Sequence, residues 1–501
     1  MKGSYLLAHD LGTSGNKATL FDPDGRLLMS RTIAYGTQYS NHNWAEQDPA
    51  DWWRAVCEST QAIVEIYPAN QIGVVSFSGQ MMGCLIVDKE GNPLRNHILY
   101  SDQRSTAQIQ EVIDTVGEHK IYQITGHRGS ASYGLSKLMW IRDHENHLYK
   151  QAVKMLNAKD YINFKLTGRM VTEYNDASST NAFDLKTFSW SEEILEAGRI
   201  PHSMMPNPVP STEVIGHVTA EAAAATGLIK GTPVVAGAGD GGCATVGIGS
   251  VRKGVTYNYI GSSSWISTTS ETVIEDPKMI TFTWAHPVKR LFQPCGTMQT
   301  AGSSYAWLRD QLGVAEVEVA KQRNVSPYKV LDEQVARSPV GSNGVIFLPY
   351  LLGERSPRWN PLAKGAFLGL NLTTTKADIF RSVLEGITMN LAVILHALQQ
   401  GVDITEMRIL GGGAKGLEWQ QILADVYGMD ILVPDYLEEA TSMGAAIIGG
   451  VGVGILDSFD CVEDFVHIEK RVQPKVENTK RYHELIPFFN EAYERLEPMF
   501  R

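Results

Sequence analysis

Two short segments of this chain have residue types suited to holding an anion. Each is an apolar strand that stops at glycine and small hydroxyl residues and then resumes as a second strand. The turn residues are Gly12, Thr13 and Ser14 in the first segment and Gly261, Ser262 and Ser263 in the second. Glycine lets a ligand approach the main chain, and unpaired N–H groups and hydroxyls can donate to phosphate oxygens. The two hairpins therefore predict one phosphate chain held from two sides.

Two charged residues flank the first of these turns. Asp10 ends the strand before it and Lys17 follows it. The carboxylate could hold Mg²⁺ through water, and the cation could meet phosphate oxygens. The spacing is not that of a Walker loop, which requires G-x-x-x-x-G-K-[ST]. An ordinary tight hairpin, in which Asp10 and Gly12 only make the turn, explains this segment equally well.

A carboxylate suited to proton transfer stands at a predicted helix start. The segment 234–244 is a strand, a tight turn and the beginning of a helix, and it contains G-x-G-x-x-G from Gly237 to Gly242. A dinucleotide-binding unit also needs an acidic residue about 20 positions further on, and none lies between Asp240 and Glu271. The glycine pattern is therefore not interpreted as a dinucleotide site. Because Asp240 stands at a helix start beside the expected cleft, we interpret it as a general base that takes a proton from an attacking hydroxyl. A plain helix N-cap is the alternative.

A third glycine cluster, Gly411 to Lys415, follows an apolar strand and precedes a helix. Consecutive glycines at such a turn let a ligand touch the main chain, and the helix N-terminus adds the positive end of its dipole. An ordinary connection explains one glycine well and three poorly. We therefore favour a nucleotide contact at this cluster.

Two polar segments could contact the hydroxyls of a sugar or polyol. Gln80 and Asp102 each follow a predicted strand, and Met81 and Met82 offer an adaptable apolar wall. Taken singly, each polar residue is better explained as a loop residue than as a ligand. The segment Gly353–Pro357 is either a loop at a cleft or an internal ion pair.

The order of elements predicts an α/β protein of two domains. Strand-like runs such as Gly73–Phe77 alternate with helical patterns such as Lys376–Gln399, and 501 residues suffice for two cores. The hairpins open the two halves, so we expect duplicated domains, 1–248 and 249–501, that face each other across a ligand cleft. The proline-rich stretch Pro201–Pro210 is predicted to be a loop.

The composition of the chain limits which partners and which cellular location are expected. A net charge of −11 argues against nucleic acid or an anionic membrane, since both require a concentrated positive field. Five scattered cysteines without a C-x-x-C pattern, and no leader-like N-terminus, favour a cytoplasmic protein. The apolar run Gly444–Leu456 is too short to span a membrane and predicts a buried helix.

In combination and in order, these motifs resemble the FGGY carbohydrate kinases, a branch of the actin-like, sugar-kinase and Hsp70-type ATPases. The resemblance runs nearly end to end, through Asp10-Leu-Gly-Thr-Ser, Ser78-Gly-Gln-Met, Gly239-Asp-Gly, Gly261-Ser-Ser, Ala301-Gly302, Trp307-Leu-Arg-Asp310 and Gly411-Gly-Gly-Ala-Lys415. It implies two ribonuclease-H-like domains that close on MgATP and a small polyol, ketose or sugar acid. The γ-phosphoryl group would pass to a terminal hydroxyl.

The resemblance also implies roles for individual residues. Asp240 matches the family's catalytic base and Asp10 its carboxylate near magnesium. The first phosphate loop is matched by Gly12, Thr13, Ser14 and Lys17, the second by Gly261, Ser262 and Ser263, the nucleotide contacts by Gly302, Gly412, Gly413 and Ala414, and the sugar contacts by Gln80, Met81, Met82 and Asp102.

Within the family the pattern is nearest to the xylulokinases, which implies D-xylulose as the acceptor and ATP with Mg²⁺ as the donor. Xylulokinases usually carry histidine where this chain has Met82, and the loss of a hydroxyl partner can change discrimination strongly. Ribulose, erythritol, glycerol and gluconate are therefore alternative acceptors. An actin-like or Hsp70-like ATPase switch without sugar kinase activity is the rival of another class. A homodimer is one option for assembly.

Overall fold

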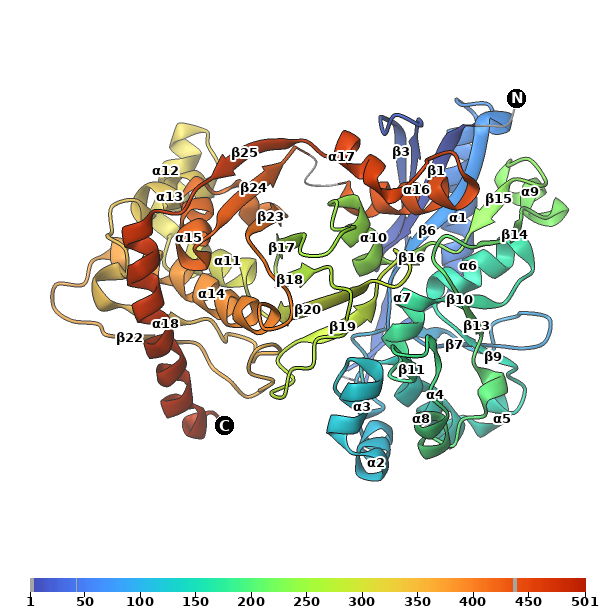
Figure 1. Ribbon diagram of the computed structural model, residues 1–501, viewed down its shortest axis with the longest axis horizontal. Coiled ribbons are helices and arrows are strands. Elements are labelled where there is room, and N and C mark those ends of the chain that lie inside the picture. The colour runs from blue at the N-terminus through green and yellow to red at the C-terminus, as the bar shows by residue number, and fades with distance from the viewer. Residues whose placement is uncertain (1–3, 42, 436–438) are drawn as a thin grey trace.

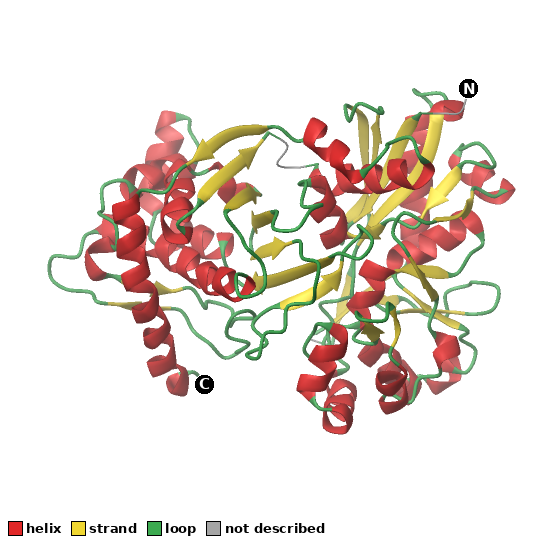
Figure 2. Ribbon diagram, in the orientation of Figure 1, coloured by secondary structure: helices red, strands yellow, loops and turns green. Residues whose placement is uncertain are grey.

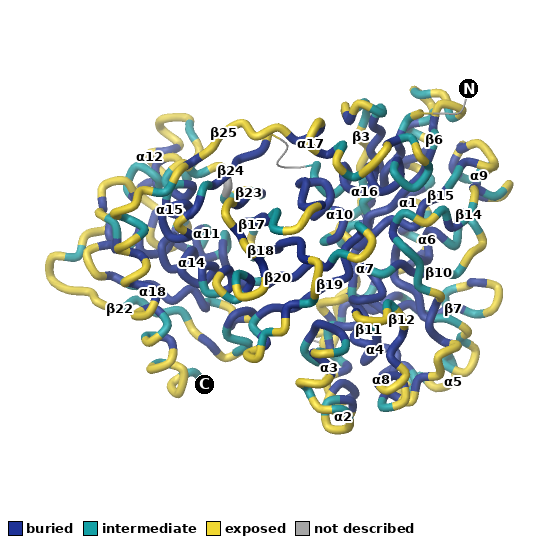
Figure 3. Tube along the Cα trace, in the orientation of Figure 1, coloured by how far each residue is buried: buried dark blue, intermediate teal, exposed yellow. Residues whose placement is uncertain are grey.

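The computed structural model describes residues 4–41, 43–435 and 439–501. Two α/β halves lie side by side, with the N-terminal half on the right of Figure 1 and most of the C-terminal half on the left. In each half, helices flank a central sheet (Figure 2). Buried residues concentrate along the strands and on the helix faces that cover them (Figure 3).

The sheet of the first half joins an antiparallel hairpin to parallel strands. Its strands, in spatial order, are β14 (Val214–His217), β15 (Pro233–Val235), β6 (Ile72–Gly79), β1 (Tyr5–Leu11), β2 (Gly15–Phe21) and β3 (Leu27–Ala34), with β16 (Ala238–Gly239) on the end of β6. β1 pairs antiparallel with β2 and parallel with β6. The helices around it include α1 (Pro49–Val64), α6 (Ala158–Thr167), α9 (Ala220–Thr226), α10 (Asp240–Gly247) and α16 (Ala440–Val453).

The alternation of side chains along β1 decides where Asp10 points. Leu7 packs with Trp52 of α1 on one face of the sheet, whereas Leu6 and Ala8 pack on the other face with apolar residues of α10 and α16. Successive side chains of a strand point to opposite faces. Asp10 continues the second row and therefore lies on the face where α10 and α16 begin.

The second half repeats this plan. Its strands, in spatial order, are β19 (Phe282–Ala285), β20 (Phe292–Met298), β18 (Ser264–Thr268), β17 (Thr256–Ile260), β23 (Glu406–Leu410), β24 (Asp430–Pro434) and β25 (Ile468–Val472). β17 pairs antiparallel with β18 and parallel with β23, as β1 does with β2 and β6. The two hairpins thus occupy the same place in two sheets of the same topology, as the duplicated plan predicts.

The core of the second half is built around one long helix. α14 (Lys376–Leu398) packs with β18 and β20 and with its neighbouring helices. Those neighbours are α11 (Gly302–Gln311), α13 (Pro327–Val335), α15 (Leu417–Tyr427) and α18 (Val476–Leu496), with α12 (Val314–Arg323) beside α13. Among the described residues α14 is the one helix long and apolar enough to cross a membrane, but 83% of its apolar window is buried within the protein, as in a core helix.

The helix α16 belongs to the second half by sequence and to the first half by packing. It lies on β1 and β6 and contacts α10 along its length, as Figure 1 shows beside the first sheet. Two glycines permit this approach, because a Cβ on Gly247 would meet the carbonyl oxygen of Ala440 at 1.7 Å and one on Gly444 would meet that of Cys243 at 1.8 Å. A division of the chain at residues 248/249 therefore does not separate the two packed bodies completely.

A smaller lobe extends from the first half with its own apolar cluster. It contains α2 (Thr106–Val116), α3 (Glu118–Thr125), α4 (Gly134–His144), α5 (Asn146–Tyr149), α8 (Glu192–Ala197) and the strand pair β7 (Leu85–Val87) and β9 (Lys154–Leu156). The loop predicted over Pro201–Pro210 is wrong in part, since Asn207–Val209 forms β13, parallel to β10 (Val171–Glu173). Pro208 is tolerated because this strand pairs on one side only.

Candidate active site

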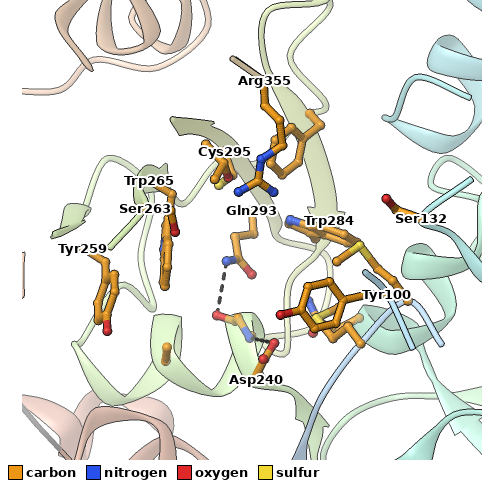
Figure 4. A pocket seen from close by; sticks show the side chains of 18 of the residues that line it. Tyr100, Ser132, Asp240, Tyr259, Ser263, Trp265, Trp284, Gln293, Cys295 and Arg355 are labelled. Carbon is orange, nitrogen blue, oxygen red and sulfur yellow. Dashed lines mark hydrogen bonds between the residues drawn. The ribbon is translucent and has the colours of Figure 1, made fainter. Parts of the chain in front are cut away.

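A cavity of about 840 Å³ lies between the two halves (Figure 4). Both halves supply its walls, so it is the cleft that the duplicated plan predicts. The predicted site residues that line it are Thr13, Met81, Met82, Asp240, Ser263 and Gly412. Others are not part of the lining: Asp10, Gly12, Ser14, Lys17, Gln80, Asp102, Gly261, Ser262, Gly302 and Gly413. Ala414 lies in the short 3₁₀ helix Gly412–Lys415, and its side chain lies outside the described part of the structure.

The first hairpin turn has its carbonyl oxygens occupied and its N–H groups open. Tyr35 bonds two of the carbonyls, with its hydroxyl donating to Gly12 O at 2.6 Å and its N–H to Ser14 O at 3.1 Å. Gln47 Nε2 donates to Thr13 O at 2.7 Å. The N–H groups of Thr13 and Ser14 have no hydrogen-bond acceptor among the described residues. The turn therefore presents donors without competing acceptors, which suits an anion.

The second hairpin turn also has hydrogen-bonded carbonyl oxygens and open N–H groups, but other residues donate to its carbonyls. Gly261 O accepts from the N–H of Gly302 at 2.9 Å, and Ser262 O accepts from two further N–H groups at the start of α11. Ser263 O accepts from the Gly261 N–H across the turn. Within the residues that the structure describes, the N–H groups of Ser262 and Ser263 remain open. Two donor turns, one from each half, thus lie at the cleft.

Asp240 is the first residue of α10, directly after the N-cap Gly239. Its carboxylate faces the cavity and accepts a hydrogen bond from the Gly241 N–H at 2.7 Å (Figure 4). Asn175 fixes the turn before it, because its Oδ1 accepts from the Gly239 N–H at 3.2 Å. Removal from bulk water, followed by the negative charge of Asp10, raises the pKa of Asp240 to about 6. A carboxylate with that pKa is a competent base near neutral pH.

Asp10 lies beneath the first turn rather than in the cavity wall. Ser78 Oγ donates to its Oδ1 at 2.9 Å. Burial raises the pKa of Asp10, whereas the Ser78 hydrogen bond and the charge of Lys17 lower it. The described residues contain no group of three acidic, histidine or cysteine side chains that could enclose a metal. A single carboxylate beside a phosphate site fits Mg²⁺ that is bound chiefly through water and substrate phosphates.

Lys17 is engaged by a residue from the other end of the sequence. Its Nζ lies 2.9 Å from Oε2 of Glu439, which precedes α16. The pair is partly exposed, at about a quarter of each side chain. The predicted phosphate contact of Lys17 thus competes with an ion pair, because α16 packs on the first sheet and brings Glu439 to the end of β2.

The third glycine cluster forms the strand-to-helix turn that the sequence predicts, between β23 and α15. Gly411 has a φ of +81°, and a Cβ there would meet Ile260 O at 2.6 Å. A Cβ on Gly412 would meet nothing within 4 Å, because this residue faces the cavity. Gly411 and Gly412 therefore bring main chain to the cavity wall, where a flat ligand can approach it.

Family comparisons agree with this geometry. The chain matches the N-terminal domain of the FGGY family of carbohydrate kinases over residues 5–247 and the C-terminal domain over residues 256–453. This chain belongs to the FGGY family of carbohydrate kinases. The expected two-domain sugar-kinase fold and the assignment as a carbohydrate kinase are thereby confirmed, and FGGY kinases use ATP as a substrate.

The relatives of this FGGY kinase include gluconokinases and xylulose kinases. A gluconokinase of Bacillus licheniformis is 33% identical, with 97% of this chain and 95% of that protein covered. A xylulose kinase of Staphylococcus xylosus is 31% identical, with coverage of 98% and 100%. The crystal structure of a ligand-bound xylulose kinase from Lactobacillus acidophilus superposes with a TM-score of 0.92 at 26% identity and covers 99% of both chains. The substrate is thus a sugar, and the two names are about equally close.

Two residues that the sequence predicts as sugar contacts have hydrogen-bond partners inside the protein. Asp102 is fully buried, and both its oxygens accept hydrogen bonds, from the Ala45 N–H and from Arg104. Gln80 Nε2 donates to Gln47 Oε1, which ties it to the support of the first turn. Neither side chain lines the cavity, because the strands that precede them carry these residues into the core.

Met82 does line the cavity, in a backbone conformation that needs support. Its φ is +66°, which is rare for a residue with a side chain. Ser179 Oγ accepts from its N–H at 3.1 Å, and the buried Lys137 donates to its carbonyl oxygen at 3.2 Å. Lys137 also donates to the carbonyls of Ala131 and Ser132, and burial lowers its pKa to about 7. Lys137 thus links the segment at Met82 to the segment Ala131–Ser132.

Several cavity residues lay outside the site that the sequence predicted. Aromatic rings make up much of the wall: Tyr100, Tyr133, Tyr257, Tyr259, Trp265, Phe282, Trp284 and Trp359. Gln293 and Arg355 add polar groups (Figure 4). The segment Gly353–Pro357 is a loop at the cleft, since Arg355 reaches the cavity while Glu354 is buried and bonds to Gln299 N and Asn390. Isolated aromatic residues give no local signal, because their strands are joined only in the folded sheet.

Proposed function

We propose that this FGGY kinase transfers the γ-phosphoryl group of ATP to a terminal hydroxyl of a small open-chain sugar, with Asp240 as general base. The observation that carries this proposal is the position of Asp240. Its carboxylate faces a cavity whose lining includes residues of both donor turns and many aromatic rings.

The positions of the residues suggest a separate role for each in the reaction. The open N–H groups of Thr13, Ser14, Ser262 and Ser263 would hold the phosphates from both sides. With a pKa of about 6, Asp240 is mostly ionised at neutral pH and can accept the hydroxyl proton as the oxygen attacks phosphorus. Asp10 would hold Mg²⁺ through water, and the metal would neutralise charge on the phosphates. Closure of the two halves would exclude water.

Two acceptors are the leading candidates. D-xylulose is the one that the sequence motifs imply, and xylulose kinases are among the relatives. Gluconate is supported by gluconokinase relatives of slightly higher identity and by Met82, which stands where xylulokinases usually carry histidine. Both acceptors have a terminal hydroxyl that could reach Asp240. Five free cysteines fit the cytoplasmic location proposed for such an enzyme.

The test is the replacement Asp240→Asn, measured as sugar-dependent ADP release. We expect kcat to fall by about a thousand-fold or more while the affinity for ATP stays unchanged, because the amide cannot accept the proton. Asp48→Asn is the matched control, since Asp48 also begins a helix and accepts from a nearby N–H, at 2.9 Å from Ala50 N, but is not part of the cavity lining.

The outcome also separates this proposal from an ATPase switch. A switch would hydrolyse ATP at a rate that no sugar changes, and Asp240→Asn would leave no sugar-dependent step to lose. If the Asp240→Asn protein retains more than a few per cent of the sugar-dependent rate, Asp240 is not the base.

A further inference from the structure

We propose that the acceptor of this enzyme is a sugar acid and that the guanidinium of Arg355 binds its carboxylate at the end of the cavity opposite Asp240. This inference rests on the proposed function, because it assumes that the acceptor hydroxyl lies at Asp240.

Arg355 is a charged cavity residue without an acidic partner in the described part of the chain. Two other charged residues of the lining are paired with each other, since Arg128 Nη1 lies 3.5 Å from Glu118 Oε1. No carboxylate oxygen of the described residues lies within 4 Å of the Arg355 guanidinium. An arginine keeps its charge under all ordinary conditions. A partly enclosed guanidinium of this kind is complementary to an anion from outside the protein.

The neighbouring carboxylate, Glu354, is turned away from the cavity. It is buried, and its oxygens accept from the N–H groups of Gln299 and Arg355 and from Asn390 Nδ2 at 2.6 to 2.9 Å. Burial raises its pKa to about 7. Glu354 therefore fixes the main chain beside Arg355 and leaves the guanidinium free to face a ligand.

The loop that carries Arg355 is fixed on both sides of that residue. Before it, Glu354 and Asn360 exchange backbone hydrogen bonds at 2.9 Å. After it, the Ser356 N–H donates to Thr297 O and its hydroxyl donates to Ile280 O at 2.6 Å. The backbone beside Arg355 is thus anchored to β20 and to the segment just before β19, which fixes the position from which the side chain extends.

The charges of Arg355 and Asp240 act at different ends of the cavity. The charge that raises the pKa of Asp240 comes from Asp10. The positive charge of Arg355 acts instead on Glu354, Tyr133 and Cys295, whose pKa values it lowers against the stronger effect of burial. A ligand that reaches both ends therefore needs a hydroxyl at one terminus and an anion at the other.

Gln293 lies between these two ends (Figure 4). Its Nε2 donates to Gly241 O at 3.3 Å, whereas its Oε1 is buried and has no partner among the described residues. It is 2% exposed, so an unpaired amide oxygen here is costly unless a ligand bonds it. A hydroxyl in the middle of an open-chain sugar acid would supply that bond.

An aldonic acid has all three features in order, with a terminal hydroxyl, a chain of hydroxyls and a carboxylate. In the reaction the terminal oxygen forms a bond to the γ-phosphorus, the bond from that phosphorus to ADP breaks, and the proton passes to Asp240. The carboxylate takes no part in bond making. Arg355 is therefore assigned as a residue that determines specificity.

The experiment compares two pairs of acceptors that differ only at the anionic end. D-gluconate is paired with D-glucitol and D-xylonate with xylitol, and ADP formation is measured with saturating ATP. For the unaltered enzyme, we expect kcat/KM for each acid to exceed that for its neutral partner by about ten-fold or more, as a charge-assisted pair would give. A faster reaction with either neutral partner overturns the proposal.

Arg355→Gln then tests the residue. We expect KM for gluconate to rise by about thirty-fold, with kcat for the neutral acceptors nearly unchanged, since only the acid loses a partner. Arg355→Lys should recover part of the affinity, because it keeps the charge and loses the two-pronged geometry. Arg337→Gln removes the same charge from an exposed site outside the cavity lining and should change nothing.

Two outcomes would overturn the assignment in recognisable ways. If Arg355→Gln lowers kcat equally for acids and neutral sugars, Arg355 contacts the transferred phosphoryl group. If a sugar phosphate of similar length is a better acceptor than either acid, the anion is not a carboxylate. Should no acceptor at all be phosphorylated, the proposed kinase function fails, whereas turnover of neutral sugars alone refutes only this inference.

Discussion

The two hairpins occupy the same place in two sheets of the same topology, yet their flanking residues differ. In the first, Asp10 and Lys17 lie opposite each other across the two strands, so charged residues flank the turn. In the second, the corresponding pair is Tyr259 and Trp265, whose rings stack with centroids 4.1 Å apart. Both turns keep their N–H groups open, but one adds charge to the site and the other adds an aromatic wall. The two turns thus share open N–H groups, whereas their flanking residues are charged in the first hairpin and aromatic in the second.

The largest effect is expected from the charged flank. Asp10→Asn should lower kcat by about a hundred-fold or more, because the group proposed to hold Mg²⁺ near the phosphates loses its charge. It should also move the acidic limb of the kcat/KM profile. The base works only when ionised, so activity of the unaltered enzyme should fall as pH drops through about 6.

Asp10→Asn removes the negative charge that helps to raise the pKa of Asp240, so that limb should shift to lower pH. Asp22→Asn, a change of the same kind at an exposed turn, serves as the control. A profile that keeps its midpoint would show that Asp10 does not act on the base.

An intermediate effect is expected from the support of the second turn. A Cβ on Gly302 would meet Gly261 O at 2.3 Å, so Gly302→Ala must displace either the turn or the start of α11. We expect KM for ATP to rise by about ten-fold with little change in KM for the sugar, since the N–H donors of this turn would lose their alignment. Gly36→Ala, where a Cβ meets nothing within 4 Å, is the matched control. A sugar KM that rises as much as the ATP KM would place this turn at the acceptor instead.

The smallest effect concerns the ion pair of the first hairpin. Glu439→Gln should lower KM for ATP by about three-fold, because it frees Lys17 for phosphate and removes a negative charge near Asp10. Glu406→Gln breaks a comparable exposed pair with Arg471 and should leave KM unchanged. An ATP KM that does not fall would indicate that Lys17 is an anchor for α16 and has no contact with phosphate.

Local patterns predicted the elements that depend on near neighbours. The turns at Gly12 and Gly261, the helix start at Asp240 and the turn at Gly411 each arise within a few residues, where glycine, strand ends and helix starts leave a clear trace. The boundaries moved by a residue or two, as for the helix expected over Lys376–Gln399, which ends at Leu398. The buried helix predicted within Gly444–Leu456 is α16, although its packing on the first sheet was not foreseen.

Side-chain roles were less predictable than elements. Asp102 and Gln80 are polar residues after strands, as a sugar site requires, but the fold turns them inward to Arg104 and Gln47. From the sequence, Arg355 belonged to a short segment that could be either a loop at the cleft or an internal ion pair. No local pattern distinguishes a side chain that faces a cavity from one that faces the core, because that choice depends on residues far away in the sequence.

By itself, the sequence determined the kinase family, the paired hairpins and the helix that starts at Asp240, because glycine conformation, strand alternation and helix ends are properties of short segments. Only the tertiary structure decided that the charge of Asp10 acts on Asp240, that Glu439 meets Lys17, and that Arg355 and Gln293 share one cavity. Those contacts join residues from different strands and helices, and they exist only once apolar burial has closed the sheets and brought the two halves together.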